Sequence, residues 1–189
     1  MIRCSDELVC FPMSFQIESF SDNRHLHGTI EALKLVRQVE VDYPPRVDIG
    51  DDDSELENWL LGGETIERWV AVEDREVIGH VGLNLPASYI LDWLDRSDTV
   101  STARGGFAEI SKLFVIPSRR SVGVASRLLD VATAASWEMG RQPALAVVDT
   151  SADAVRLYQH RGMTLIGEFQ GVHGRNLLFT GDAPVADGV

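Results

Sequence analysis

A strand, a basic loop and a long amphipathic helix follow one another in the middle of the chain, and this unit constrains the fold most. Phe107–Ile116 is mainly apolar and ends at Pro117, as a buried strand does before a turn. From Gly123 to about Met139 apolar residues recur at helical spacing, and Gly140 stands where a C-terminal cap is expected. A strand that leads into a helix in this way indicates an α/β arrangement, with the helix packed on one face of a sheet.

The flanking segments supply further strands and helices around this unit. Before it we expect a strand at 15–20, helices at 26–39 and around 56–60, and a hairpin with strands 68–72 and 77–85. After it we expect a strand at 144–148, a helix at 152–161 and an antiparallel pair at 163–169 and 176–180. The economical fold is a mixed α/β (α+β) domain, in which a single mixed sheet carries helices on both faces.

The domain is expected to cover 1–180, followed by a flexible tail at 181–189. A 21-residue connection, 86–106, precedes the central strand and contains an apolar patch at 89–94. Connections of this length tend to be functional or mobile. The patch is interpreted either as a lid over a substrate or as a contact between the subunits of a homodimer.

Composition removes several functions from consideration. Seventeen basic residues against 29 acidic residues give a formal net charge of −12. Nucleic acids and anionic membranes bind clusters of Lys and Arg, so neither is an expected partner. No apolar run reaches the roughly 18 residues that span a bilayer, and the chain starts without a signal-peptide pattern, so we expect a cytoplasmic protein. Cys4 and Cys10 have no further Cys or His ligands nearby, which predicts neither a disulfide framework nor a metal site.

The loop between the central strand and its helix is positively charged within an acidic protein. Residues 110–129 contain no acid and four bases, Lys112, Arg119, Arg120 and Arg127. The first turn of a helix offers unpaired N–H groups and the positive end of the helix dipole, so it binds anions readily. Gly123 lets a phosphate group approach the backbone because it has no side chain. The segment therefore predicts a phosphate site.

Three interpretations of this segment compete. A nucleotide-triphosphate P-loop requires Gly-Lys-Ser/Thr at the helix start, and the chain has none there. A dinucleotide fold requires Gly-x-Gly-x-x-Gly and a later acid; Asp149 stands where that acid is expected, but the loop has one glycine of the three. In the third interpretation the arginines are solvated in an ordinary β-α turn. The pattern Arg-x-x-Gly-x-Ala does not by itself decide among them.

Two further motifs favour the phosphate site. Arg120-x-x-Gly123-x-Ala125, after a strand that ends in Leu-x-Val-x-Pro, resembles the acyl-CoA signature of the GNAT superfamily of N-acetyltransferases. Upstream, Ile78–Leu83 is similar to the third strand of that family. The resemblance covers roughly residues 65–180.

The second family motif lies downstream. Ser151-Ala-Asp-Ala-Val-Arg-Leu-Tyr158-x-x-x-Gly162-Met163 resembles Asn-x-x-Ala-x-x-Leu/Phe-Tyr-x-x-x-Gly-Phe. Ser151 replaces the usual Asn, which puts one cofactor or positioning hydrogen bond in doubt. Met163 replaces the usual Phe and is a conservative core exchange.

The resemblance implies a mostly antiparallel sheet of six to seven strands with one splayed parallel pair. It also implies acetyl-CoA as co-substrate without a metal, its pantetheine arm inserted between the splayed strands like a missing strand. Arg119 or Arg127 would then assist the pyrophosphate as point charges. The residues that the resemblance assigns to acetyl-CoA are Leu113, Phe114, Val115, Arg119, Arg120, Ser121, Val122, Gly123, Val124, Ala125, Ser126 and Ser151.

Acetyl transfer to an amine requires a base, because an amine with a pKa of about 10.4 is almost wholly cationic at neutral pH. Glu109 lies fourteen residues before Gly123, where some family members carry a glutamate base. In a regular strand Glu109 shares a face with 111, 113 and 115, opposite Lys112. Tyr158 lies where the family often has the general acid for the departing thiolate. The alternatives are a surface charge for Glu109 and a packing aromatic for Tyr158.

Residues outside the motifs also allow two interpretations. Trp93 is the tryptophan expected in an acceptor pocket. His80 is either a buried core histidine or faces that pocket, whereas His25 and His27 are expected to be solvated and to bind no metal. The acidic run at 48–57 is either a solvated loop or attracts a cationic amine.

The sequence thus predicts an N-acetyltransferase that moves the acetyl group of acetyl-CoA directly to a primary amine through a ternary complex. Direct transfer is expected because Cys4 and Cys10 are remote from the motifs in sequence. A small amine or amino-acid-like metabolite, an aminoglycoside-type antibiotic and a protein N-terminus or lysine remain open as acceptors. A non-catalytic acyl-CoA-binding module and a dinucleotide enzyme are the alternative functions.

Overall fold

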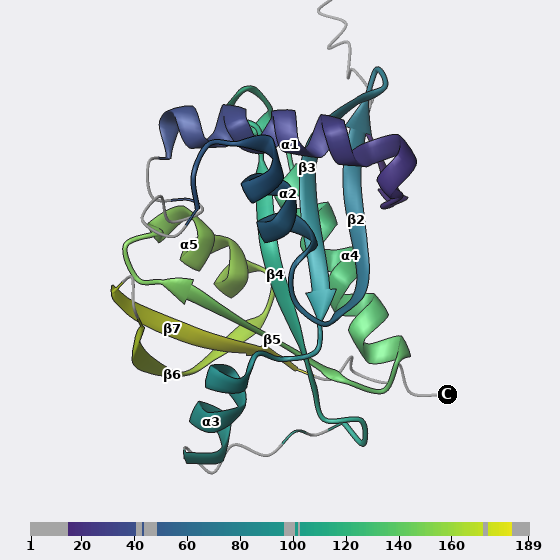
Figure 1. Cartoon of the computed structure of the whole chain (residues 1–189). Helices are drawn as coiled ribbons and strands as arrows, with labels where there is room; N and C mark the ends of the chain where they lie inside the picture. The colour runs from purple at the N-terminus through teal and green to yellow at the C-terminus, as the bar shows by residue number, and fades with distance from the viewer. Residues whose placement is uncertain are drawn as a thin grey trace, which may run out of the picture.

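The protein is built around one seven-stranded sheet, seen in a computed structural model that describes residues 15–40, 43, 49–96, 101, 103–171 and 174–182. The sheet order is β1-β2-β3-β4-β5-β7-β6 (Figure 1). The strands are β1 (Gln16–Ser19), β2 (Thr65–Glu73), β3 (Glu76–Asn84), β4 (Phe107–Val115), β5 (Gln142–Val148), β6 (Met163–Gly171) and β7 (Gly174–Gly181). Within the described residues β4 and β5 form the one parallel pair, and the other neighbours are antiparallel. The expected mixed, mostly antiparallel sheet is therefore confirmed.

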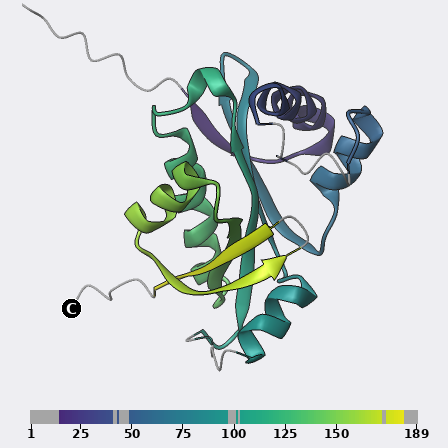
Figure 2. The ribbon, with the colours of Figure 1, turned by 90° about the vertical axis from the view of Figure 1, so that its left-hand side faces the viewer.

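Helices cover both faces of the sheet, as the sequence indicates (Figure 2). They are α1 (Asp22–Val39), α2 (Asp53–Leu61), α3 (Ser88–Arg96), α4 (Val124–Glu138) and α5 (Ala152–His160), with a short 3-10 turn η1 (Pro117–Arg119). α1 and α2 lie on one face, where α1 packs against β3 and β4. α4 and α5 lie on the other face, where α4 packs across β2 to β5 and α5 packs against β6.

The first helix begins about one turn earlier than the sequence predicts. Ser21, with extended backbone, is its N-cap, so the helix starts at Asp22 and not near Leu26. The backbone N–H of Ser21 donates to Nδ1 of His25 at 3.0 Å. The expectation that both histidines are solvated is therefore wrong for His25, which is buried, and right for His27, which is exposed.

The helix α3 occupies part of the 86–106 connection, where the sequence predicts no regular element. Ile90 and Leu94, four residues apart, are buried and pack with Phe107, Ala144 and Leu178 in a second apolar cluster. Among the α3 residues whose burial is described, only these two are buried. Two buried positions are too few for a helical repeat to be recognised in the sequence. The helix α3 thus packs against residues near the starts of β4 and β5.

A bulge at Lys112 interrupts the alternation of β4. Lys112 has a φ of 53°, and the pairing with β3 shifts register at this point. Ser111 pairs with Gly82 and Phe114 pairs with His80, so two residues of β4 stand opposite one residue of β3. The extra residue reverses the directions of the β4 side chains that follow.

The predicted faces of β4 are therefore wrong beyond the bulge. Val115 pairs with Gly79, whose Cα faces Leu128 of α4, so Val115 lies on the α4 side and not on the side of Glu109. Lys112 reaches carbonyl oxygens at the end of α2, so it shares the face of Glu109 although the opposite face was expected. The residue pattern gives no sign of the positive φ that causes both differences.

The parallel strands β4 and β5 part soon after they begin. Their register runs only from Phe107 opposite Gln142 to Glu109 opposite Ala144. Beyond this point β5 continues to Val148 with β7 as its described neighbour, and β4 continues with β3. The splayed parallel pair expected from the resemblance is confirmed, and the site is built at this opening.

Some sequence expectations concern residues outside the described part. Cys4, Cys10, the start of the acidic run and residues 183–189 of the expected tail lie there. The single domain over 1–180 stays a prediction. None of the described helices combines the length and the apolar character needed to cross a membrane.

Candidate active site

A continuous cleft of about 2090 Å³ opens where β4 and β5 part. Ordinary ligand pockets measure roughly 300–1,000 Å³, so this cleft has room for a long ligand and a second molecule beside it. Its walls come from β4 at 109–115, β5 at 146–148, the loop before α4, the start of α5 at 151–154, the ends of α1 and α2, and the β3–α3 connection at 84–89.

The first turn of α4 opens into one end of the cleft. The helix begins where the sequence predicts, with Gly123 at the N-cap in the left-handed region, at φ 89°. Ser121 before it also has a positive φ of 62°. No described side chain bonds to this helix end, so its N–H groups stay available to a ligand. Among the described loop residues assigned to acetyl-CoA, Val122 is outside the cleft lining and exposed, so its predicted role rests on its backbone.

The arginines around this loop are already paired. Arg120 forms an ion pair with Glu40 of α1 at 2.8 Å, and Arg119 forms one with Glu73 of β2. Arg127 lies outside the cleft, its guanidinium 5.8 Å from the centroid of a phenylalanine ring just before β1. Arg127 therefore does not reach the site as proposed for a point charge, and the local charge is smaller than the sequence indicates.

The edge of β4 assigned to the pantetheine arm lies along the middle of the cleft. The carbonyl oxygen of Leu113 accepts a hydrogen bond from the hydroxyl of Tyr43 at 3.3 Å, and that of Val115 accepts one from Nε of Arg120 at 3.4 Å. Tyr43 is edge-on to Trp59, and burial raises its pKa well above the ordinary value. The sequence gives no sign of these contacts, because Tyr43 belongs to none of the motifs and is followed by two prolines.

Glu109 lines the opposite end of the cleft, so the structure places it in the same cavity as the phosphate loop. Its Oε2 accepts a hydrogen bond from the backbone N–H of Ala87 at 2.9 Å. Burial raises the pKa of Glu109, while the Ala87 N–H, the Lys112 charge and the Tyr89 hydroxyl act in the opposite direction. Tyr89, which stands on α3, has its own pKa raised to about 12, by burial first and then by Glu109. Sequence reasoning missed this role of Tyr89 because it did not identify α3.

Lys112 holds the end of α2 against the sheet. Its Nζ donates to the carbonyl oxygens of Leu60, at 3.2 Å, and of Gly62, and lies 5.5 Å from the centroid of a Trp59 ring. Burial lowers the pKa of Lys112 to about 8, assisted by the positive charge of Arg68. These contacts fix one wall of the cleft beside Glu109.

Tyr158 lines the cleft from α5. Its side chain is buried, with its ring 5.9 Å from that of Phe179, and burial raises the pKa of Tyr158 to about 12. Its hydroxyl bonds to none of the residues that the structure describes. Ser151, at the N-cap of α5, also lines the cleft and makes no side-chain cap bond. Tyr158 is thus protonated at neutral pH and lies in the wall of the cleft.

Two other predicted residues have structural roles. Trp93 lies outside the cleft lining: its Nε1 donates to the carbonyl oxygen of Glu168 at 3.0 Å, and its ring covers Gly167. The expected place of Trp93 in an acceptor pocket is therefore wrong, because the buried positions of α3 turn it toward β6. His80 is fully buried in the core, where burial lowers its pKa to about 3 and its Nδ1 bonds to the carbonyl of Lys112 at 2.9 Å.

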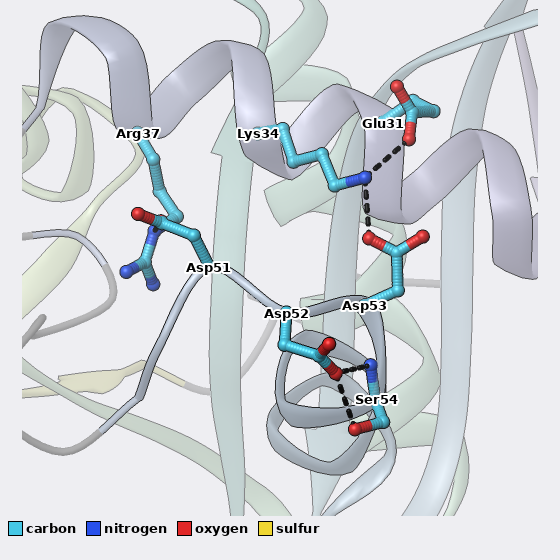
Figure 3. A network of polar contacts seen from close by, with 7 residues as sticks. All are labelled: Glu31, Lys34, Arg37, Asp51, Asp52, Asp53 and Ser54. Carbon is cyan, nitrogen blue, oxygen red and sulfur yellow. Dashed lines mark hydrogen bonds and ion pairs between the residues drawn. The ribbon is translucent and has the colours of Figure 1, made fainter.

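The acidic run pairs with α1 (Figure 3). Asp51 bonds to Nε of Arg37 at 2.9 Å, and Asp53 bonds to Nζ of Lys34 at 2.5 Å. The side chain of Asp52 caps α2 by accepting a hydrogen bond from the backbone N–H of Ser54. These acids fasten α2 to α1, which gives them a structural role in place of the proposed attraction for an amine. In the described part of the chain there is no group of three side chains suited to hold a metal ion.

Residues 33–163 match the model of the acetyltransferase (GNAT) family, and the chain belongs to this family. A comparison with curated protein sequences gave no significant match. The family assignment agrees with the open α4 terminus, the splayed strands and the cleft between them.

Solved structures of the same fold include several acetyltransferases. NAA60 of Arabidopsis thaliana in complex with acetyl-CoA has a TM-score of 0.63 and 20% identity, over 88% of this chain and 97% of that one. The PaiA N-acetyltransferase of Thermoplasma acidophilum in complex with coenzyme A has a TM-score of 0.61 and 14% identity, over 90% and 100%. An aminoglycoside 6'-acetyltransferase type Ii has a TM-score of 0.62 and 17% identity, over 87% and 95%. At these identities the likeness shows the shared fold.

Proposed function

We propose that the protein transfers the acetyl group of acetyl-CoA directly to a primary amine while both substrates are bound. The observation that carries the proposal is that one cleft joins the open first turn of α4 to Glu109 and Tyr158. From Glu109 to Val115 a strand extends about 20 Å, so a phosphate end and an acid–base end are well separated. A long cofactor lying along β4 would reach from one end to the other.

The proposed position of acetyl-CoA follows the walls of the cleft. Its pyrophosphate would take hydrogen bonds from the N–H groups around Gly123, a helix start without a side-chain cap among the described residues. Its pantetheine amides would bond to the edge of β4 at 113–115, which β5 does not pair with and where Tyr43 and Arg120 donate to the carbonyl oxygens of Leu113 and Val115. Ser151 stands at the start of α5 on the same cleft.

The proposed reaction balances with one base and one acid. Glu109 first passes one proton of the acceptor's ammonium group to solvent and then takes a second proton from the nitrogen, which attacks the thioester carbonyl carbon so that a C–N bond forms. The C–S bond then breaks, and the leaving thiolate takes the proton of the Tyr158 hydroxyl. The products are the N-acetyl amine and CoA with a free thiol, and solvent returns the proton from Glu109 to Tyr158. Transfer is proposed to be direct because this acid and this base line the same cleft.

Release of the CoA thiol tests the proposal. Purified protein is mixed with acetyl-CoA and a panel of amines that includes alkyl amines, a polyamine, an aminoglycoside and peptides with free N-termini. We expect thiol release that depends on an amine and yields the N-acetyl product by mass spectrometry. Binding of CoA without turnover of any amine would instead indicate an acyl-CoA-binding module. Saturation by NAD without CoA binding would indicate a dinucleotide enzyme.

A further inference from the structure

The acid–base end of the cleft exposes apolar side chains to solvent. Eight large apolar residues of the described chain are exposed, and four of them line this cleft: Val39, Leu85, Tyr89 and Leu91. Apolar groups that gather at a cavity in this way mark a binding surface more often than isolated ones do. The phosphate and pantetheine positions proposed above do not cover three of the four, Leu85, Tyr89 and Leu91.

These three side chains belong to the segment that surrounds Glu109. Asn84, just before Leu85, pairs with Glu109 across the strands, and the Ala87 N–H donates to its carboxylate at 2.9 Å. Leu85 is 37%, Tyr89 49% and Leu91 42% exposed. A molecule that presents its nitrogen to Glu109 would therefore lie against them.

The charge of this end suits a single ammonium group. Its described lining holds the carboxylates of Glu64 and Glu109 and the cations of Lys112 and Arg141, so the opposite charges balance before an acceptor binds. Lys112 directs two of its hydrogen bonds to the end of α2 and stays within reach of the Glu109 charge. An acceptor with several positive charges would place the extra ones beside Lys112 or against apolar side chains, where they lose hydration.

The geometry points to an acceptor that is a primary monoamine, its nitrogen attached to an apolar chain or ring. The nitrogen lies beside Glu109, and the apolar body covers Leu85, Tyr89 and Leu91. This inference rests on the proposed function and adds to it the class of the acceptor. The same chemistry is presented by a free amine and by a peptide whose first residue is apolar.

A series of straight-chain amines tests the class. We expect kcat/KM to rise by roughly two- to fourfold with each methylene group from propylamine to hexylamine, because each group leaves water against this surface. Spermidine and kanamycin are expected to have lower kcat/KM values than hexylamine. A peptide with an N-terminal Leu, assayed beside leucine amide, shows whether the apolar amine is taken free or as a chain terminus.

Leu91→Asp and Leu165→Asp form a matched pair of variants. Both leucines are similarly exposed, at 42% and 47%, but Leu165 lies on β6 outside the cleft lining. Leu91→Asp is expected to flatten the dependence on chain length and to lower kcat/KM for hexylamine by roughly fivefold. Leu165→Asp is expected to keep the wild-type series. Leu91→Asn repeats the test without a new charge, and CoA affinity confirms that each variant is folded.

Distinct outcomes separate this inference from the proposed function. A flat series, a preference for spermidine or kanamycin, or equal behaviour of the two Asp variants would overturn the apolar monoamine while acetyl transfer stands. Binding of CoA without acetylation of any amine would overturn the proposed function, and this inference with it. A rising series that Leu91→Asp alone flattens supports both.

Discussion

At the scale of single residues, the surroundings of Glu109 act on its pKa in opposite directions. Burial favours the neutral carboxyl group, whereas the Ala87 N–H, the Lys112 charge and the Tyr89 hydroxyl favour the carboxylate. A base must be ionised to accept a proton. The neighbours therefore decide over which pH range Glu109 can act, and Tyr89 is the neighbour whose contribution is easiest to remove.

Tyr89→Phe should move the acidic limb of the pH–rate profile upward by roughly one pH unit, because the carboxylate loses a hydrogen-bond donor. The ring that packs 5.8 Å from Phe169 is kept, so the fold should be unaffected. The measurement is kcat/KM for a good amine between pH 5 and 9, alongside the wild type.

The double variant is the control for this shift. In a Glu109→Gln background the acidic limb of the pH–rate profile should be absent. Adding Tyr89→Phe to that variant should then leave the profile unchanged. If Glu109→Gln leaves the limb in place, Glu109 is not the base. If Glu109→Gln removes the limb but Tyr89→Phe does not move it, Tyr89 has only a packing role.

Tyr158→Phe should lower kcat by roughly a hundredfold or more, the usual contribution of a positioned acid. The substitution removes a hydroxyl that bonds to no described residue and keeps the ring against Phe179, so CoA affinity should be unchanged. Turnover and the Kd for CoA are measured on the same preparation. A parallel loss of both would show that the residue supports binding and not proton transfer.

At the scale of elements, the first turn of α4 is the proposed pyrophosphate site. Gly123→Asp should abolish CoA binding because it places a carboxylate where the pyrophosphate is expected. Gly140, just beyond the other end of α4, also has a positive φ, 68°, and open space around it. Gly140→Asp should therefore cost similar stability and leave CoA binding intact. If calorimetry gives the two variants equal CoA affinity, the pyrophosphate does not bind at this end of the helix.

The other informative element is α2, whose last turn has no basic residue of its own. Side chains from the sheet bind its terminal carbonyl oxygens in place of a local cap. Lys112 binds those of Leu60 and Gly62, and Arg68 binds that of Leu61 at 2.6 Å. Two strands thereby hold the wall of the cleft that stands opposite α3.

The depressed pKa of Lys112, about 8 against an ordinary 10.5, gives this contact a pH signature. Between these values the unfolded chain binds more protons than the folded one, so the free energy of unfolding gains a term that rises with pH. Lys112→Met removes the term. The stability of wild type relative to the variant, from urea denaturation, should therefore increase from pH 8 to pH 10. A constant difference would show that Lys112 titrates normally.

At the scale of the whole molecule, the sequence predicts the sheet and the central unit well. The run from Phe107 to Gly140 has an apolar strand, a proline, a glycine and a long apolar stripe, and each signal is local. The open α4 start therefore lies where expected. Glu109 and Tyr158 also share one cleft, because motif spacing places them on elements that meet at the parted strands.

The differences arise where tertiary contacts decide the local structure. The bulge at Lys112 depends on pairing with β3, and α3 depends on two buried side chains meeting the ends of distant strands. Trp93 then turns away from the cleft and Tyr89 turns toward it. Arg127 similarly finds an aromatic ring near β1 that no local pattern reveals.

A crystal structure with CoA and hexylamine bound tests the proposed site most directly. We expect pyrophosphate oxygens within hydrogen-bonding distance of the N–H groups around Gly123 and the CoA sulfur beside the hydroxyl of Tyr158. The amine nitrogen should lie against Glu109. A pyrophosphate bound away from the start of α4, or a sulfur remote from both Glu109 and Tyr158, would contradict it.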